Sequence, residues 1–313
     1  MLNPVNGLVC FVKPSEGSVL TYNLNTGDKT FWLETRTRKL LRGHDGQAAV
    51  DTSRMRWGFG FGFDLATKEH KVVSVFETIN NTEENICNEN PFGLDTQQCE
   101  ILTVGGVRNE WRQMDKKFTP GKIVGASVYV NGVIYWLDEH HKVHEVIMAF
   151  DVTSERFNKV VVIPTFINNR WRDYPVNGGI QNISIYVDLL EVDGHIALWE
   201  RVDGCSINIW TYDEHWTQEK ITLPFNLWNA YDDYVSIEAI TGTDLIIFKN
   251  FNQETKFETL FYYNRKMKNI EKQVDIKGIC WDRDAVGFKF STFVDSLMPV
   301  QSTYPCYTPE SRV

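Results

Sequence analysis

The hydrophobic residues of this chain gather in short runs separated by polar turns, and one such arrangement recurs four times. Each copy is an apolar residue, a polar residue and a glycine, followed by a mostly apolar run; the copies begin with Val5-Asn6-Gly7, Val130-Asn131-Gly132, Val192-Asp193-Gly194 and Ile240-Thr241-Gly242. Asn-Gly and Asp-Gly favour two-residue hairpins, because such a turn needs positive φ at its centre. The pattern predicts repeated antiparallel hairpins, with a strand on each side of a tight turn.

A second pattern follows the first and indicates the size of the repeating unit. It reads as a strand, a polar turn and a further strand, and it occurs at residues 22–28, 63–69, 150–157 and 262–268. The two patterns together give each unit about four strands, and Gly132, Gly194 and Gly242 lie 62 and 48 residues apart. Repeats of about 40 to 50 residues with four strands are typical of propeller blades. The sequence therefore predicts an all-β fold, a β-propeller of about six four-stranded blades.

Composition and charge argue against two classes of partner. Hydrophobic residues make up 42% of the 313 residues and aromatic residues 13%, which is enough for a continuous core. No apolar run is long enough to cross a bilayer. The net charge of -9 argues against nucleic acid, because phosphate binding needs a basic face. We therefore expect neither a membrane nor a nucleic acid as partner.

The cysteines and histidines do not predict a metal site or a cofactor. The N-terminal residues lack the basic flank and apolar run of a secretory signal, so we expect a cytoplasmic or nuclear protein with free thiols. None of the six cysteines forms a Cys-x-x-Cys pair. His140, His141 and His144 could offer nitrogen ligands to a transition metal, but a solvated hairpin turn explains them better.

An ordered series of motifs resembles the plant F-box-associated domain, a kelch-like propeller. The resemblance covers nearly the whole chain, to about residue 297, and its most recognisable parts are Asn6-Gly7-Leu8-Val9-Cys10, Gly60-Phe61-Gly62-Phe63-Asp64, Cys99-Glu100-Ile101-Leu102-Thr103, Tyr135-Trp136 and Ile207-Asn208-Ile209-Trp210. The order of these motifs is far more specific than any one of them. We expect a propeller domain over residues 1–300 and a C-terminal tail over residues 301–313.

The resemblance implies a protein-interaction module related to the substrate-recognition domain of F-box ubiquitin-ligase receptors. In that family the domain follows an F-box, a helical segment that docks on the ligase adaptor. The motif series begins at Asn6, so we expect the F-box to be absent from this chain. We therefore expect a protein target as partner, and we do not expect the adaptor to bind without an F-box.

Two aromatic-rich loops are the main candidate binding sites. One follows Pro164 and the other follows Pro224, at equivalent blade boundaries. Trp, Tyr and Arg carry most of the binding energy at protein interfaces, because they bury large areas and keep a polar group. The candidate residues are Arg170, Trp171, Arg172, Tyr174, Trp228 and Tyr231. The open alternative is that Trp171 and Trp228 fill gaps between blades.

A polar segment after Leu40 is a further candidate, with His44 and Asp45 adjacent and within reach of a channel mouth. No motif indicates catalysis: the sequence has neither Gly-x-Ser-x-Gly nor His-Glu-x-x-His. The glycines of residues 58–63 have phosphate-loop spacing, but Phe at every second position indicates a strand. The alternative function is a repurposed propeller that binds a small molecule, or acts as an enzyme, at the channel mouth.

Overall fold

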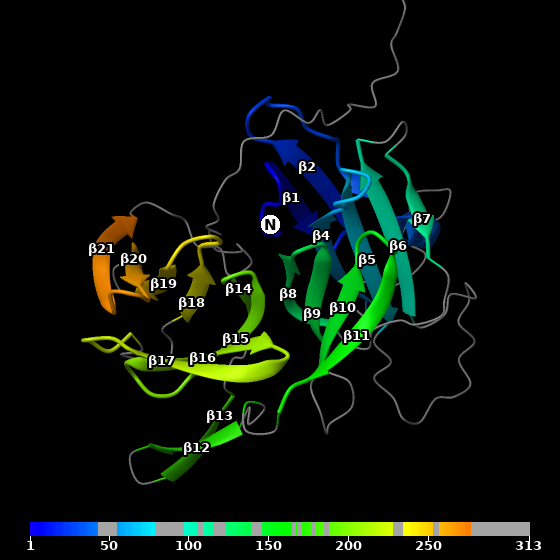
Figure 1. The fold of residues 1–313 in the computed structure, drawn as a ribbon. Coiled ribbons are helices and arrows are strands. Elements are labelled where there is room, and N and C mark those ends of the chain that lie inside the picture. The colour runs from blue at the N-terminus through cyan, green and yellow to red at the C-terminus, as the bar shows by residue number, and fades with distance from the viewer. Residues whose placement is uncertain are drawn as a thin grey trace, which may run out of the picture. The chain divides into compact units, whose positions relative to one another are not determined.

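The computed structural model describes residues 1–42, 55–78, 97–105, 109–114, 123–138, 146–164, 167, 171–176, 179–184, 188–227, 234–252 and 257–276. The described residues form six antiparallel sheets whose neighbouring strands are consecutive in the chain (Figure 1). Five of these sheets have three or four strands, close to the predicted six blades. The chain divides into two compact units, one over Leu2–Thr119 with Val294–Val313, and one over Pro120–Phe293 with Met1.

The first unit begins with a sheet of three strands, and one short helix follows that sheet. Its elements are β1 (Leu8–Lys13), β2 (Ser18–Asn23), β3 (Leu33–Glu34) and α1 (Arg36–Arg42). The segment before β1 runs antiparallel to it, because the Leu2 N–H donates to the Cys10 carbonyl at 2.8 Å and Val5 bridges Leu8. The first predicted hairpin is therefore confirmed, with Asn6 at φ 43° and Gly7 at φ 79°.

Helix α1 was not predicted, and its N-terminus explains why. The Thr35 hydroxyl accepts a hydrogen bond from the Arg38 N–H at 3.2 Å, as an N-cap residue does. The carboxylate of Glu100, buried in another strand, accepts the N–H groups of Arg36 and Thr37 at 2.6 and 2.7 Å. The first backbone N–H groups of a helix have no partner within the helix, and here two of them donate to a residue more than sixty positions away in the sequence.

The second sheet of this unit contains β4 (Met55–Phe63), β5 (His70–Thr78), β6 (Gln97–Val104) and β7 (Trp111–Gln113). The glycines of residues 58–63 lie in β4, so the strand prediction is confirmed. His70 is 2% exposed, and its ring lies 5.4 Å from that of Phe61 and 4.9 Å from that of Phe63. Its Nε2 lies 2.9 Å from the Val5 carbonyl, which joins the N-terminal segment to β5.

The second unit contains three four-stranded sheets and one hairpin. The first sheet holds β8 (Ile123–Val130), β9 (Val133–Asp138), β10 (Val146–Asp151) and β11 (Arg156–Val162). The hairpin is β12 (Trp171–Val176) with β13 (Gly179–Ser184). The next sheet holds β14 (Asp188–Val192), β15 (His195–Arg201), β16 (Ser206–Asp213) and β17 (His215–Thr222), and the last holds β18 (Tyr234–Ala239), β19 (Leu245–Asn252), β20 (Phe257–Asn264) and β21 (Asn269–Ile276).

The first two strands of the β14–β17 sheet are buried on both faces, which explains their largely apolar sequence. Leu189 and Leu198 pack into one hydrophobic cluster with the sheet of β8–β11. Leu190 and Trp199, their neighbours in the sequence, pack into another cluster with the sheet of β18–β21. Successive residues of a strand point to opposite faces, so a strand buried on both faces needs apolar side chains at every position.

The second repeated pattern forms turns that close on their own Asn or Asp side chain. In each turn the side-chain oxygen accepts a backbone N–H two or three residues later, as in Asx-turns; the acceptors are Asn23, Asp64, Asp151 and Asn264. Four residues after each acceptor the backbone has positive φ, at Gly27, Lys68, Glu155 and Lys268. At residues 63–69 the turn joins the first two strands of its sheet, whereas at residues 150–157 and 262–268 it joins the last two.

The tight-turn prediction holds for three of the four copies of the first pattern. Asn131 and Asp193 have φ values of 49° and 53°, and each is followed by a glycine with positive φ. The fourth copy is different, because β18 ends at Ala239 and β19 begins at Leu245, with Gly242 at φ 72° between them. A β-branched residue such as Thr241 does not suit the first position of a two-residue turn, since that position needs positive φ.

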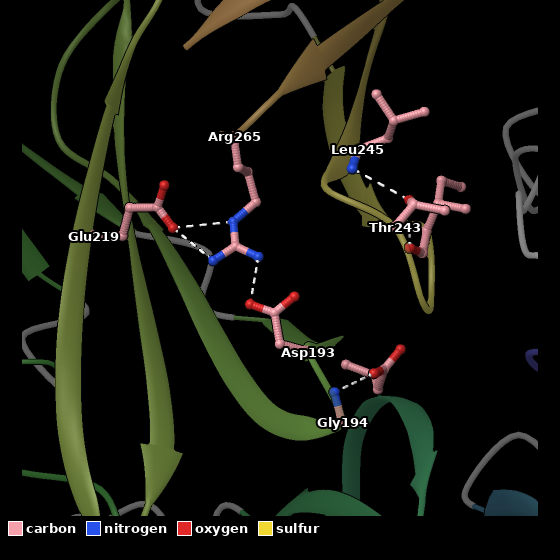
Figure 2. Close-up of polar contacts among 8 residues, drawn as sticks. Asp193, Gly194, Glu219, Thr243, Leu245 and Arg265 are labelled. Carbon is pink, nitrogen blue, oxygen red and sulfur yellow. Dashed lines mark hydrogen bonds and ion pairs between the residues drawn. The ribbon is translucent and has the colours of Figure 1, made fainter. Parts of the chain in front are cut away.

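Polar contacts between these turns connect the sheets of the second unit (Figure 2). The Asn131 side chain donates to the Gly194 carbonyl at 3.1 Å, and the Glu191 carboxylate accepts both the Gly194 N–H at 2.8 Å and the Thr241 hydroxyl. Arg265 donates to the Asp193 carboxylate at 2.8 Å.

Arg265 also reaches the outer strand of the neighbouring sheet. Its Nε and one terminal nitrogen donate to Glu219 Oε2 on β17 at 3.0 and 2.7 Å (Figure 2). Burial acts to lower the pKa of Arg265, but its bonds to Asp193 and Glu219 outweigh burial and raise that pKa. The guanidinium therefore holds the turn of one sheet against two positions of the next.

Replacing Gly17 by Ala should destabilise the protein more than replacing Gly27 by Ala. Both glycines have positive φ, but a Cβ on Gly17 would lie 2.9 Å from the Trp57 ring, whereas nothing lies within 4 Å of a Cβ on Gly27. We expect an extra loss of about 1 to 3 kcal/mol for Gly17→Ala, as for overpacked sites. Urea unfolding of both variants measures this difference, and equal losses would contradict the crowding at Gly17.

Stability should fall as the pH drops below the ordinary range of histidine. Burial lowers the pKa of His70 from 6.5 to about 4, against the smaller opposing effect of its bond to Val5. The folded protein therefore keeps His70 neutral while the unfolded chain binds a proton, so this stability is complete above pH 6.5 and is lost as the pH falls toward 4. We expect a loss of about 2 kcal/mol between pH 7 and pH 5.

The His70→Gln variant is the reference for this prediction, because it has no imidazole to titrate. Urea unfolding at pH 7 and pH 5 should show a smaller pH effect in the variant than in the wild type. The same pH dependence in both proteins would mean that other groups cause it.

Replacing Arg265 by Ala should cost about 1 to 2 kcal/mol, a modest value because Asp193 is 56% exposed and solvent screens the pair. Arg265→Lys should restore only part of this loss, because one ammonium cannot reproduce the planar fork of donors. Lys266→Ala, at an exposed position of the same turn, is the matched control and should change stability by less than about 0.5 kcal/mol. Similar unfolding curves for Arg265→Ala and Lys266→Ala would refute the role of Arg265.

Candidate functional site

The second unit has two chemically different ends. In each four-stranded sheet, one end holds the turn between the first and second strands and the turn between the third and fourth strands. We call this the turn end, and it holds the contacts of Asn131 and Arg265. Because neighbouring strands are antiparallel, the turns between second and third strands and the connections between sheets lie at the opposite end. We call this the loop end. Short hairpin turns dominate the first, and the longer connections belong to the second.

Both predicted recognition segments start from anchored points at the loop end. Ile163 is 1% exposed and Leu223 is 4% exposed, and each follows the last strand of its sheet and precedes a proline. Three residues after the prolines, Ile167 and Leu227 are again buried, at 1% and 0%. The two connections therefore leave their sheets in the same way, which supports the predicted equivalence of the two blade boundaries.

The predicted site residues lie mostly beyond the described part of the chain. Trp171, Arg172 and Tyr174 belong to β12, which pairs with β13 from Trp171 opposite Ser184 to Val176 opposite Gly179. This segment was predicted as a loop, and the structure corrects it to a hairpin. Its sequence signal was Asn177-Gly178, a pair that favours a two-residue turn. The remaining candidates lie outside the described residues: Arg170, Trp228, Tyr231, His44 and Asp45, as do His140, His141 and His144.

One part of the loop end that the structure describes is the tight turn at residues 202–205, between β15 and β16. The Asp203 carboxylate accepts the Cys205 N–H at 2.9 Å and the Cys205 thiol at 3.3 Å. Burial acts to raise the pKa of Asp203, but hydrogen bonds from Cys205 and Ser206 outweigh it and hold that pKa below its usual value. This turn therefore presents the negatively charged carboxylate of Asp203 beside the half-buried thiol of Cys205.

This turn also fixes the start of the second predicted segment. The Leu227 N–H donates to the Gly204 carbonyl at 2.9 Å, and the Asn250 side chain donates to the Leu227 carbonyl at 2.6 Å. A Cβ on Gly204 would lie 3.0 Å from Asn226 Oδ1, so the Asn226 side chain packs closely against this turn. Leu227, the residue before Trp228, is thus bonded to two neighbouring sheets.

The sequence analysis missed a cavity in the first unit. It has a volume of about 280 Å³ and lies between the β1–β2 turn, β3 and the start of α1, with Lys13, Ser18, Trp32 and Lys39 among its lining residues. The available signal was the exposed Phe31-Trp32 pair close to the basic residues 36–42. This signal was weak, because exposed aromatic residues are common and only the fold brings Lys13 beside Trp32.

The described residues contain neither a group of metal ligands nor a membrane-spanning helix. Within them, no group of three His, Cys, Asp or Glu side chains could hold a metal ion. No helix among the described residues is long and apolar enough to cross a membrane. The three cysteines in these ranges are free thiols, and burial raises the pKa of the Cys10 thiol to about 12, which leaves it unreactive.

Comparison with curated proteins finds F-box proteins of Arabidopsis thaliana. The putative F-box protein At4g38870 is 24% identical over 228 residues, which cover 70% of this chain and 44% of that protein. The F-box/kelch-repeat protein At2g43445 is 29% identical over 159 residues, which cover 51% of this chain and 31% of that protein. The putative F-box protein At1g76830 is 42% identical over 57 residues, or 18% of this chain and 15% of that protein. The chain thus spans less than half the length of these relatives.

Among solved structures, the Hadza microbial sialidase Hz136 aligns with a TM-score of 0.44 and 13% identity, over 86% of this chain and 56% of that chain. At these values the likeness indicates nothing about function. The family comparison is decisive by contrast, because the model of the F-box associated beta propeller domain matches residues 1–297. The predicted β-propeller fold and the resemblance are both confirmed: this chain belongs to the F-box associated β-propeller domain family.

Proposed function

We propose that this chain is a protein-recognition module that binds the target of an F-box type ubiquitin-ligase receptor. The observation that carries this proposal is the family match over residues 1–297, together with relatives that are F-box proteins. The described residues add that rigid sheets carry longer connections at one end, an arrangement typical of binding surfaces.

The loop end of the second unit is the proposed recognition surface. Its central residues are Arg170, Trp171, Arg172, Tyr174, Trp228 and Tyr231; His44 and Asp45 belong to the first unit and are candidates for a separate contact. Its supporting features are the buried anchors Ile167 and Leu227 and the Asp203 turn. Aromatic and Arg side chains on a rigid base lose little conformational entropy on binding, and therefore make effective interface anchors.

The experiment starts with affinity capture of plant proteins by the full chain, followed by purification of the recovered target and measurement of its affinity. If Trp171 and Trp228 are interface anchors, Trp171→Ala and Trp228→Ala should each weaken binding by about 2 kcal/mol or more and leave unfolding unchanged. Trp199→Ala is the core control, since Trp199 is 5% exposed, and it should cost about 3 to 5 kcal/mol of stability.

The outcomes separate recognition from packing. A large loss of stability in Trp171→Ala and Trp228→Ala, like that of the core control, would assign both residues to the gaps between blades. Wild-type binding by both folded variants would place recognition elsewhere on the chain. Recovery of no stoichiometric protein, with thermal stabilisation by a metabolite instead, would overturn the proposed function itself.

A further inference from the structure

The last strand of each sheet in the second unit has one edge that no other described strand covers. The first strand β14 lies beside the first strands β8 and β18, whereas β11, β17 and β21 each stand at the far side of their sheet. A free edge carries a row of unpaired backbone N–H and C=O groups, so it can pair with a strand of another molecule. Natural proteins usually prevent such pairing with charged side chains, β-bulges or very short edge strands.

Most of the last strands have one of these protective features. In the first unit, β3 and β7 have only two and three residues. In the second unit, β17 contains Glu219 and Lys220, and Lys220 is exposed. Strand β21 has exposed Glu271 and Lys272, and its register against β20 is irregular. All four strands are therefore poor templates for a further strand.

Strand β11 is protected in its first half and not in its second. The first half begins with the exposed Arg156, and its register shifts against β10. The second half is Val160-Val161-Val162, a run of three β-branched residues without charge that pairs with β10 in regular register. Val162 is 59% exposed, whereas Val161 is 4% exposed and belongs to the core. A strand edge with high β propensity, no charge and an exposed apolar side chain is open to strand addition.

The unprotected half of β11 lies at the loop end. From its turn with β10 the strand runs toward Ile163 and Pro164, where the first aromatic-rich segment begins. The free edge is therefore continuous with the proposed recognition surface. This continuity favours a segment of the protein target over a second copy of the chain, because a target bound at the loop end brings its own backbone beside β11.

We propose that residues 160–162 of β11 bind an extended segment of the protein target by strand addition. Backbone N–H and C=O groups of the segment pair with those of β11, and an apolar or β-branched side chain of the segment packs on Val162. The charge of Arg156 and the register shift end the pairing toward the turn end. This inference rests on the proposed function and deepens it, because it names the conformation and chemistry of one contact with the target.

The test uses a phage-displayed library of random linear peptides, selected on the full chain. Enriched peptides should contain a run of apolar and β-branched residues without proline, because proline removes a backbone donor. A synthetic peptide of the enriched sequence should bind Val162→Lys about tenfold or more weakly than the wild type, since lysine blocks strand addition at an edge. Val162→Thr keeps a β-branched side chain without charge, so it should bind within about threefold of the wild type.

Methylation of the peptide backbone tests strand addition directly. In a strand added to an edge, every second residue directs its N–H and C=O groups to the partner strand. N-methylation at these alternate positions should weaken binding by about tenfold or more, because each change removes a donor and leaves an acceptor unpaired. Methylation at the positions between them should have little effect. A contact made by side chains alone does not give this alternation.

Gln218→Lys is the matched control for the charge placed on β11. Gln218 is exposed on β17, so the variant adds the same charge to the edge of a neighbouring sheet and should bind the peptide like the wild type. Both lysine variants should keep the melting temperature of the wild type, because both positions are exposed. Weaker peptide binding by Val162→Lys then reports the edge itself and not the fold.

Four results would overturn the inference. They are no enriched peptide, no alternation on N-methylation, equal binding by Val162→Lys and the wild type, or equal weakening by Val162→Lys and Gln218→Lys. A wild-type dimer in sedimentation velocity that Val162→Lys dissociates would also overturn it, by assigning the edge to a second copy of the chain. If the peptide result fails but the tryptophan variants still lose the purified protein target, the proposed function stands and only the β11 assignment is wrong.

Discussion

The burial of apolar side chains between successive sheets is the interaction on which the second unit depends. In β14 and β15, consecutive residues enter different hydrophobic clusters, one shared with each neighbouring sheet. These two strands are therefore closed to solvent on both faces, whereas β17, the last strand of the same sheet, is mostly exposed. Backbone groups at the strand ends leave the sheet and need other partners.

The two ends meet this need in different ways. At the turn end, Asx-type side chains close their own turns, and Glu191 and Arg265 link one sheet to the next. The side chains that make these contacts at the turn end are therefore part of the framework of the sheets. At the loop end, the connections between sheets start from buried anchors such as Leu227 and then continue for several residues before the next strand. The loop end therefore carries the longer connections, the kind of segment that commonly holds binding residues in proteins.

The first unit uses contacts between distant residues to organise its elements. Glu100 binds two backbone N–H groups of α1, and the Val5 carbonyl lies 2.9 Å from His70 Nε2. The Trp57 ring packs against Gly17 in the turn between β1 and β2. Glu100 thereby fixes the start of α1, while β3 is held by pairing with β2, and Lys39 of α1 and Glu34 of β3 both line the cavity.

The sequence by itself determined the hairpins, the blade-like repeats and the family, because each depends on short-range chemistry. Asn131-Gly132 specifies positive φ within two residues, and the apolar run of β15 specifies burial on both faces. Of the candidate site, the sequence identified the aromatic-rich segments but treated residues 171–184 as a loop, although Asn177-Gly178 favours a hairpin.

Only the tertiary structure decided the features whose partners lie far apart in the chain. Helix α1 depends on Glu100, and the position of Arg265 depends on Asp193 and Glu219. The cavity likewise depends on β3 returning beside the β1–β2 turn, which brings Trp32 under Lys13. Pattern and spacing report which residues can form a turn or a strand, but a contact between distant residues exists only after the chain has packed.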